Sequence, residues 1–103
     1  MKILSHPPLK DITLSNILYA LGDDARRHIV KNLLAAEKPL TCIEAVKGIK
    51  NLPLSTRSHC FQLLRQAGII RSEKKGRECY SEVRIVELEK KFPALIQTVI
   101  GQL

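Results

Sequence analysis

The 103-residue sequence predicts an α+β domain that is mainly α-helical with one small β-hairpin. Two observations lead to this fold class. Apolar residues recur at helical spacing through most of the chain, and two short β-prone runs flank a Lys-Lys-Gly-Arg turn at residues 74–77. The predicted order is four helices, two strands and a last helix that is kinked or broken near Pro93. This is the order of a winged helix-turn-helix.

Length and composition narrow the class of protein. With 45% apolar residues and no long low-complexity tract, residues 1–103 are expected to form a single domain, in which residues 1–10 are a leader. Pro7 and Pro8 interrupt the start, where a signal peptide needs an unbroken apolar stretch, and no run is long enough to span a membrane. We therefore expect a soluble cytoplasmic protein with no membrane partner. The net charge of +7 favours a polyanionic partner.

The first two helices are predicted from apolar spacing and capping residues. The apolar residues between 14 and 21 recur at three- and four-residue intervals, in a helix expected to begin near Asp11. Asp23 or Asp24 can cap a second helix, whose single apolar stripe ends before Pro39.

Residues 41–67 are predicted to form the helix-turn-helix. Thr41 and Glu44 have the spacing of a capping box, so a short third helix should run from there to about residue 47. The fourth helix is predicted over residues 55–66, and Gly68 stops it in the position that favours a left-handed residue.

The fourth predicted helix has one apolar face and one polar face on a helical wheel. The polar face has no carboxylate and carries short or planar hydrogen-bonding side chains of the type that reads base edges in a major groove. A solvated helix face is the alternative interpretation. Arg57 falls toward the apolar side, so we expect it to reach a phosphate rather than a base. The candidate DNA contacts on this helix are Ser55, Thr56, Arg57, Ser58, His59 and Gln62.

The predicted hairpin over residues 69–83 is the wing. Its candidate contacts with phosphates or a minor groove are Lys74, Lys75 and Arg77, which surround the glycine of the turn. A charged hairpin tip by itself is also common as a simple solvent-exposed turn. The order helix, turn, helix, glycine and basic hairpin is the more specific signal, and it favours duplex DNA as the partner.

Residues 85–103 are predicted to form a C-terminal dimerisation helix. Seven large apolar residues between positions 88 and 103 are more than one face of so small a domain needs. In the alternative interpretation this stripe only covers its own core. The residues predicted to form the dimer interface are Leu14, Ile17, Leu18, Phe92, Leu95, Ile96, Val99 and Ile100.

Two strings of the sequence are similar to those of a known family. Residues 20–29, Ala-Leu-Gly-Asp-Asp-Ala-Arg-Arg-His-Ile, resemble the Leu-x-Asp-x-x-Arg-x-x-Ile opening of the ArsR/SmtB family of small bacterial winged-helix repressors. Residues 55–70, Ser-Thr-Arg-Ser-His-Cys-Phe-Gln-Leu-Leu-Arg-Gln-Ala-Gly-Ile-Ile, resemble its recognition helix and first wing strand, and Tyr80 matches the closing tyrosine of its wing. The resemblance covers roughly residues 14–83.

The resemblance implies a sequence-specific regulator of transcription that binds double-stranded DNA. It implies a homodimer, paired through its first and last helices, that represses by binding a palindromic operator and is released by an effector. Metal-sensing members of the family bind their metal through a Cys-x-Cys box on the third helix or through Asp and His on the last helix. Here residues 40–44 carry one thiol in place of the box, and the C-terminal tail has no His or Asp, so the effector is not identified by the resemblance. We expect no metal and no cofactor.

The three cysteines are an odd number and widely spaced, which indicates reduced thiols rather than a disulfide framework. Cys42 and Cys60 are candidate redox thiols, and a Cys42–Cys60 pair is conceivable in a helix-turn-helix. The alternative for each is a small, inert packed residue.

An enzyme is not expected, because the sequence has no phosphate loop, nucleophile elbow or catalytic constellation. The alternative function is a winged-helix module that binds protein or RNA.

Overall fold

A computed structural model describes residues 2–101, without the side chains of Lys2 and Ile3. Met1 of the predicted leader, and residues 102 and 103 of the predicted C-terminal helix, lie outside the described residues. The elements are, in chain order, β1 (Lys2–Ile3), the 3-10 turn η1 (Leu9–Asp11), α1 (Leu14–Ala20), α2 (Asp24–Ala35), β2 (Leu40–Thr41), α3 (Cys42–Ala45), α4 (Leu54–Gln66), β3 (Ile70–Lys75), β4 (Glu78–Val83), α5 (Ile85–Lys91) and α6 (Leu95–Ile100).

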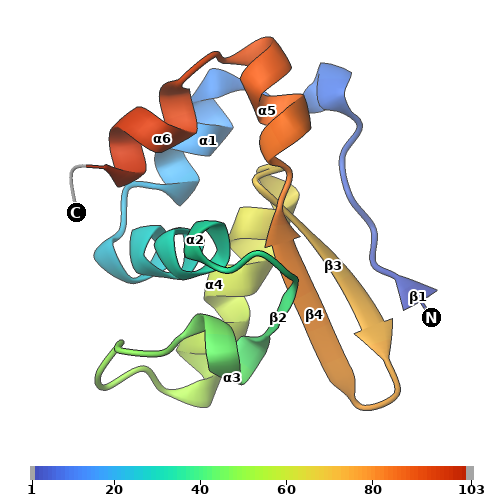
Figure 1. Cartoon of the computed structure of the whole chain (residues 1–103), viewed down its shortest axis with the longest axis vertical. Coiled ribbons are helices and arrows are strands. Elements are labelled where there is room, and N and C mark those ends of the chain that lie inside the picture. The colour runs from blue at the N-terminus through green and yellow to red at the C-terminus, as the bar shows by residue number, and fades with distance from the viewer. Residues whose placement is uncertain (1, 102–103) are drawn as a thin grey trace.

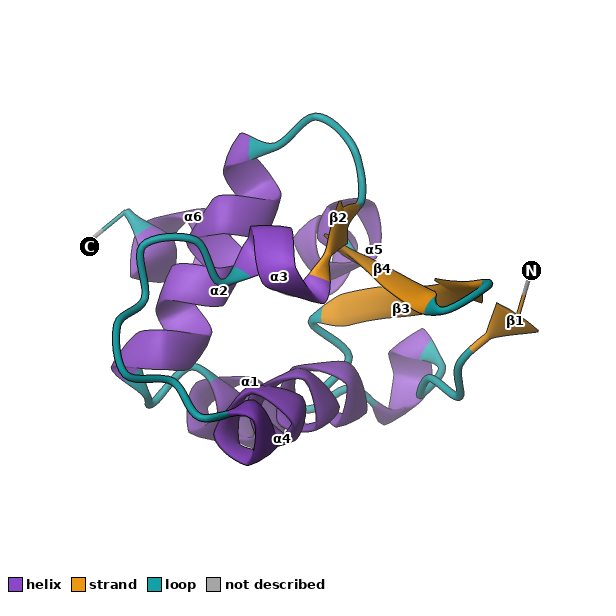
Figure 2. Cartoon of the chain, turned by 90° about the horizontal axis from the view of Figure 1, so that it is seen from below, coloured by secondary structure: helices purple, strands orange, loops and turns teal. Residues whose placement is uncertain are grey.

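The four strands form one antiparallel sheet in the order β1-β3-β4-β2. The β3–β4 hairpin projects from the helices at the end of the molecule opposite to α1, α5 and α6 (Figure 1). Seen from below, α4 lies beside α1 (Figure 2). The predicted α+β class is confirmed, and the arrangement is that of a winged helix.

Capping residues begin the first two helices. Thr13 accepts a hydrogen bond from the backbone N–H of Asn16 at 3.2 Å, so α1 begins three residues after the predicted Asp11. Asp23 accepts from the backbone N–H of Arg26 at 3.1 Å and caps α2, as one of the two predicted alternatives.

The two arginines of α2 close the end of α1. Arg26 Nε donates to the Ala20 carbonyl at 2.6 Å, and Arg27 Nη1 donates to the Leu21 carbonyl at 2.6 Å. These carbonyls lack partners within their own helix, and cations are favourable at the negative end of its dipole. The Asp-x-x-Arg string therefore has a structural role at the junction of α1 and α2.

The start of the helix-turn-helix is fixed by local hydrogen bonds. The capping box predicted at α3 is present: Thr41 accepts from the Glu44 N–H at 3.2 Å, and Glu44 accepts from the Thr41 N–H at 2.9 Å. Asn32 of α2 donates to the carbonyls of Ala45 and Lys47, both at 2.9 Å, and so satisfies the end of α3. The position of α3 is thereby tied to α2.

Gly68 ends the fourth helix for two physical reasons. Its φ of +81° lies in the left-handed region, which residues with a Cβ rarely adopt. A Cβ at this position would also overlap Cδ1 of Ile12. The end of α4 thus packs directly against the segment that precedes α1.

The core corrects the predicted dimer interface. Ile17, Ile96 and Ile100 are buried in the core of the single chain, with exposed fractions of 0%, 1% and 7%. The apolar faces of α1 and α6 cover this core. Ile96 and Ile100 therefore fit the alternative interpretation of the C-terminal stripe, and Ile17 of α1 is likewise a core residue. Of the other predicted interface residues, Leu14 and Leu18 are exposed, and Phe92, Leu95 and Val99 are half-buried.

The C-terminal segment is helical over α5 and again over α6. Between them Ala94 adopts a left-handed conformation, with φ of +63°. Its N–H donates to Glu89 Oε2 at 3.1 Å, which supplies the partner that the broken helix leaves missing.

The leader is part of the sheet, a contact that we did not predict. Strand β1 pairs with β3, and the backbone N–H of Leu4 donates to the Ser72 carbonyl at 3.1 Å. His6 Nε2 accepts from the Ser72 N–H at 2.8 Å. Burial of the ring, with the neighbouring charge of Arg84, lowers the pKa of His6, so the neutral, accepting form is favoured.

Candidate nucleic-acid interface

Helix α4 presents its polar face to solvent, as predicted. Cys60, Phe61 and Leu64 are its buried residues. The predicted base-reading residues Ser55, Thr56, Ser58, His59 and Gln62 are all exposed, and Arg57 is half-buried. The helix contains two arginines and no acidic residue, so its exposed face has nothing that repels phosphate.

The N-terminus of α4 has free hydrogen-bond donors. Its N-cap is Pro53, which makes no side-chain cap, and the first helical hydrogen bond runs from the Arg57 N–H to the Pro53 carbonyl at 2.9 Å. Within residues 2–101, the preceding N–H groups have no side-chain partner at the positive end of this 13-residue helix. Such an end binds phosphate oxygens well.

The wing is a longer hairpin with a tighter turn than predicted. Lys75 pairs with Glu78, which leaves Gly76 and Arg77 as the two turn residues. Gly76 has φ of +63° and Arg77 does not have a positive φ, as in a type II′ turn. Lys74 and Lys75, which we placed in the turn, belong to strand β3 instead.

This strand register separates the three wing cations. Directly paired residues of antiparallel strands share a face, and the faces alternate along a strand. Lys75 therefore shares a face with Tyr80, over whose ring its Nζ lies at 5.5 Å, and with the carboxylates of Glu73, Glu78 and Glu82. Those acids offset its charge.

Lys74 lies on the opposite face of the wing. It pairs with Cys79, on the side of the sheet that carries the buried hydrogen-bonded pair Ser72 and Ser81. The helices pack against this side of the sheet. Lys74 lies on the same side but is exposed to solvent, beyond the part that the helices cover. Side chains alternate between the two faces along a strand, so a predicted strand that included Lys75 would have placed Lys74 and Lys75 on opposite faces. The predicted strand ends at Glu73 and therefore did not show this separation.

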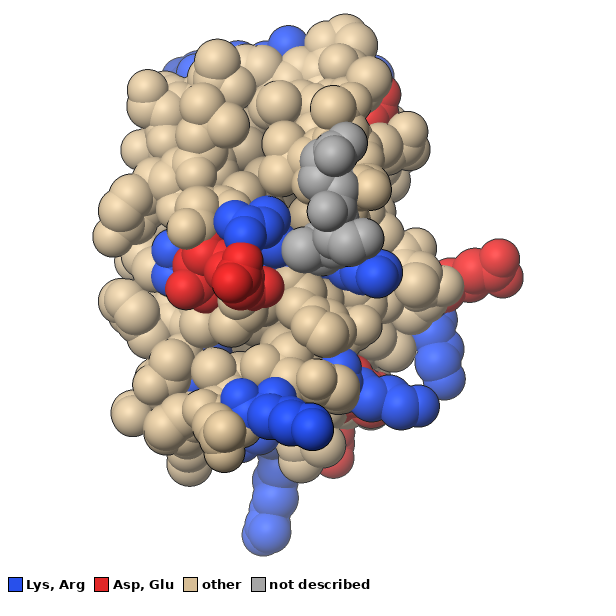
Figure 3. Space-filling model, turned by 90° about the vertical axis from the view of Figure 1, so that its left-hand side faces the viewer, with Lys and Arg blue, Asp and Glu red and all other residues tan. Residues whose placement is uncertain are grey.

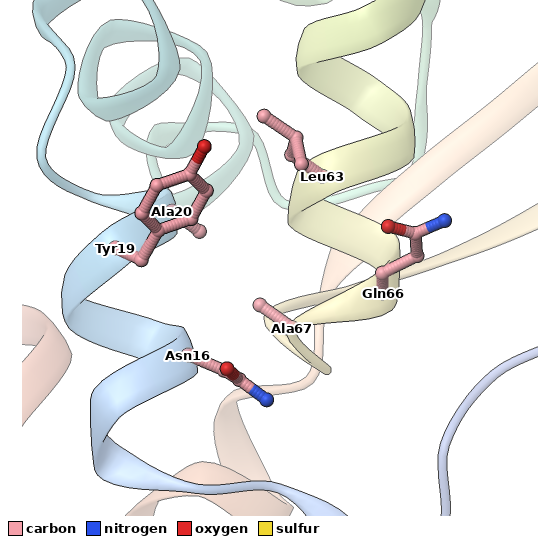
Figure 4. Close-up of a pocket in the computed structure, with 6 residues that line it drawn as sticks. All are labelled: Asn16, Tyr19, Ala20, Leu63, Gln66 and Ala67. Carbon is pink, nitrogen blue, oxygen red and sulfur yellow. The ribbon is translucent and has the colours of Figure 1, made fainter.

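A shallow pocket of about 220 Å³ opens between α1 and α4. Figure 4 shows Asn16, Tyr19 and Ala20 of α1 facing the last turn of α4. The pocket is smaller than the roughly 300–1,000 Å³ of ordinary small-molecule sites. It has no charged lining residue to hold an ionic ligand.

An uncharged surface lies at the end of the molecule away from the wing tip. Helices α1 and α6 contain no charged residue. The upper part of the face shown in Figure 3 is correspondingly almost free of Lys, Arg, Asp and Glu, which gather in its middle and lower parts. The exposed large apolar residues of α1 are Leu14, Leu18 and Tyr19.

The structure does not bring the two candidate thiols together. Cys60 is buried with 2% exposure, close to the charged groups of Asp23 and Arg26, and burial raises the pKa of its thiol. Cys42 is half-buried beside Cys79 instead, and burial raises its thiol pKa as well. The predicted Cys42–Cys60 pair is therefore replaced by a Cys42–Cys79 pair.

Two further properties concern residues 2–101 only. In this part of the chain, no three His, Cys, Asp or Glu residues are grouped so that they could hold a metal ion. No helix there has both the length and the apolar character needed to cross a bilayer.

Comparison with known proteins gives one informative likeness. The chain is 29% identical over 85 residues to a Bacillus subtilis (strain 168) protein named "Uncharacterized HTH-type transcriptional regulator YceK", and the match covers 82% of this chain and 84% of that protein. No protein-family model matches the chain. The relative's name agrees with the helix-turn-helix formed by α3 and α4, whereas the resemblance to the ArsR/SmtB family stays a prediction.

Proposed function

We propose that this protein is a regulator of transcription that binds double-stranded DNA through α4 and the wing. The observation that carries the proposal is the exposed face of α4, which is polar and free of carboxylates, next to a hairpin with cations on its tip and helix-covered side. The likeness to a protein named as a helix-turn-helix transcriptional regulator supports it. The mechanism requires no catalytic step, and such a regulator acts in the cytoplasm.

In this proposal each group of residues has its own role. His59 and Gln62 read base edges in the major groove, and the short hydroxyl side chains at the start of α4 contact bases or phosphates. Arg57 and the free N–H groups at the N-terminus of α4 hold phosphates. Lys74 and Arg77 contact the backbone beside the groove, which fixes the register of the protein on the duplex.

We further propose that the protein is a homodimer and a member of the ArsR/SmtB family that acts as a repressor. The uncharged surface of α1 and α6 supports the dimer, because interface cores are depleted of charge. Its apolar contacts are Leu14, Leu18, Phe92, Leu95 and Val99. Two-fold symmetry would present two copies of α4 about one helical turn apart, so the expected operator is a palindrome.

The test is selection of duplexes from a randomised library at near-physiological salt, with sequencing of the retained DNA. We expect recovery of one palindromic site. Uniformly weak retention of every sequence, strongly reduced by salt, would contradict an operator-binding regulator and favour the protein- or RNA-binding alternative. Light scattering at micromolar concentration tests the dimer separately, and a monomeric mass would exclude it.

A further inference from the structure

Two of the three cysteines form a close pair between the helix-turn-helix and the wing. Cys42 is the first residue of α3, and Cys79 is the second residue of β4. The Cys42 Sγ lies 4.0 Å from the Cys79 carbonyl oxygen, so the Cys42 thiol points at the backbone of Cys79. They come together although 37 positions separate them in the sequence.

The strand register explains this contact. Leu40 of β2 pairs with Ser81, and Thr41 pairs with Tyr80. Cys42 follows Thr41 as the first residue of α3, and Cys79 precedes Tyr80 in β4, so the end of this pairing brings the two cysteines next to each other. Paired residues of antiparallel strands are about 4.5–5.5 Å apart at Cα, so the residues that adjoin the last pair begin near the range that a disulfide spans.

We propose that Cys42 and Cys79 form an intramolecular disulfide on reaction with hydrogen peroxide, and that this bond weakens binding of duplex DNA. Both residues are half-buried, whereas Cys60 is 2% exposed. The pair, rather than Cys60, is therefore the oxidisable site. The effect on DNA rests on the function proposed above, whereas formation of the bond does not.

The reaction balances with peroxide as the only oxidant. The Cys79 thiolate attacks one peroxide oxygen, so that an S–O bond forms, the O–O bond breaks and hydroxide leaves to become water. The Cys42 thiolate then attacks the Cys79 sulfur, so that the S–S bond forms and the S–O bond breaks with loss of a second water. Burial raises the pKa of the Cys42 thiol, so we assign Cys42 to the second step.

The bond would act on the residues proposed to hold DNA. Cys79 pairs with Lys74 across the wing, and the guanidinium of Arg57 is close enough to Cys42 to influence its thiol. A disulfide holds its two sulfur atoms about 2.05 Å apart, so it would cross-link the start of α3 to β4. The wing and the start of the helix-turn-helix, which are otherwise joined covalently only through the intervening chain, could then no longer adjust to each other when they bind a duplex.

The first measurement is disulfide mapping of the full-length protein after treatment with hydrogen peroxide, by alkylation of free thiols and mass spectrometry. We expect a linked peptide pair containing Cys42 and Cys79, with Cys60 still free to be alkylated after unfolding. The Cys60→Ala variant should give the same bond, and Cys79→Ser should not. A Cys42–Cys60 bond, an intermolecular bond only, or free Cys42 and Cys79 would overturn the proposal.

The second measurement is the affinity of reduced and oxidised protein for the duplex selected by the reduced protein. We expect oxidation to lower the affinity at least about 5-fold, and a dithiol reductant to restore it. The Cys42→Ser variant, checked for folding by circular dichroism, should bind equally before and after peroxide. Complete disulfide formation with unchanged affinity would refute the regulatory part. Failure of the reduced protein to select any duplex would instead refute the proposed function, while disulfide mapping would still decide whether the bond forms.

Discussion

Helix α4 and the C-terminal helix α6 both place apolar residues in the core, but their sequences differ in how well they predict which residues are buried. In α4 the exposed residues after Leu54 are polar, and their exposure was predicted from the helical wheel. In α6 the buried Ile96 and Ile100 and the half-buried Leu95 and Val99 are chemically alike. Because core and dimer interface both favour large apolar side chains, sequence alone predicts a polar surface better than it divides apolar residues between these two environments.

Replacing Ile96 with alanine gives the largest expected effect, because it removes a side chain that is 1% exposed in the core. We expect the free energy of unfolding to fall by about 2–5 kcal/mol. Leu18→Ala is the matched control: Leu18 is 49% exposed in the single chain, so its loss should weaken association and change the intrinsic stability by less than about 1 kcal/mol. Urea denaturation at several protein concentrations separates the two effects. Equal losses at low concentration would show that the division into core and interface is wrong.

Adding a methyl group at Gly68 tests the junction between α4 and the segment before α1. In Gly68→Ala the new Cβ would overlap Ile12 and occupy a left-handed backbone, so overpacking of about 1–3 kcal/mol adds to a backbone cost of about 1–2 kcal/mol. Gly76→Ala has a similar positive φ but meets no atom within 4 Å, so only the backbone cost should remain. Thermal unfolding of both variants measures the difference. If the Gly76 variant were as unstable as the Gly68 variant, overlap with Ile12 would not contribute to the loss of stability at Gly68.

The local elements could be predicted because their causes are local. The Thr41–Glu44 capping box, the Asp23 cap and the left-handed Gly68 each act within a few residues, and all three were found where the sequence placed them. Contacts between distant segments were missed. His6 bonds to Ser72 across 66 positions, and Cys42 meets Cys79 across 37, and neither pair carries a periodic signal.

Substitutions on the exposed face of α4 test base reading directly. We expect His59→Ala or Gln62→Ala to lower affinity for the selected duplex by about 1–3 kcal/mol and to relax base preference at the contacted positions. Affinity for random duplex should change little, because the proposal assigns these side chains to base edges and not to phosphates. Fluorescence anisotropy with both duplexes measures the ratio. Equal losses on the two duplexes would remove base reading from α4.

The two faces of the wing make different predictions for neighbouring lysines. Lys74→Ala or Arg77→Ala should weaken all duplexes alike and reduce the slope of log affinity against log salt by about 0.9 for each phosphate that the variant no longer neutralises. Lys75→Ala should have a smaller effect, since Lys75 lies over Tyr80 and among the carboxylates of its own face. Binding titrations at several salt concentrations give the slopes. If Lys75→Ala changed the slope as much as Lys74→Ala does, DNA could not be contacting only the helix-covered face of the wing, on which Lys74 lies.

The smallest expected effect is the pH dependence of the contact between His6 and the wing strand. Burial of the ring, together with the nearby charge of Arg84, lowers the pKa of His6 in the folded state below its ordinary value of 6.5. Only the neutral ring can accept the hydrogen bond from the Ser72 N–H. The unfolded state then binds the proton more readily. The stabilisation is therefore fully present above about pH 6.5 and is lost progressively as pH falls below it. His6→Gln keeps an acceptor but does not titrate, so its urea midpoint should fall less than that of the wild type between about pH 7.5 and about pH 5.5. Parallel decreases in both proteins would assign the pH dependence to other groups.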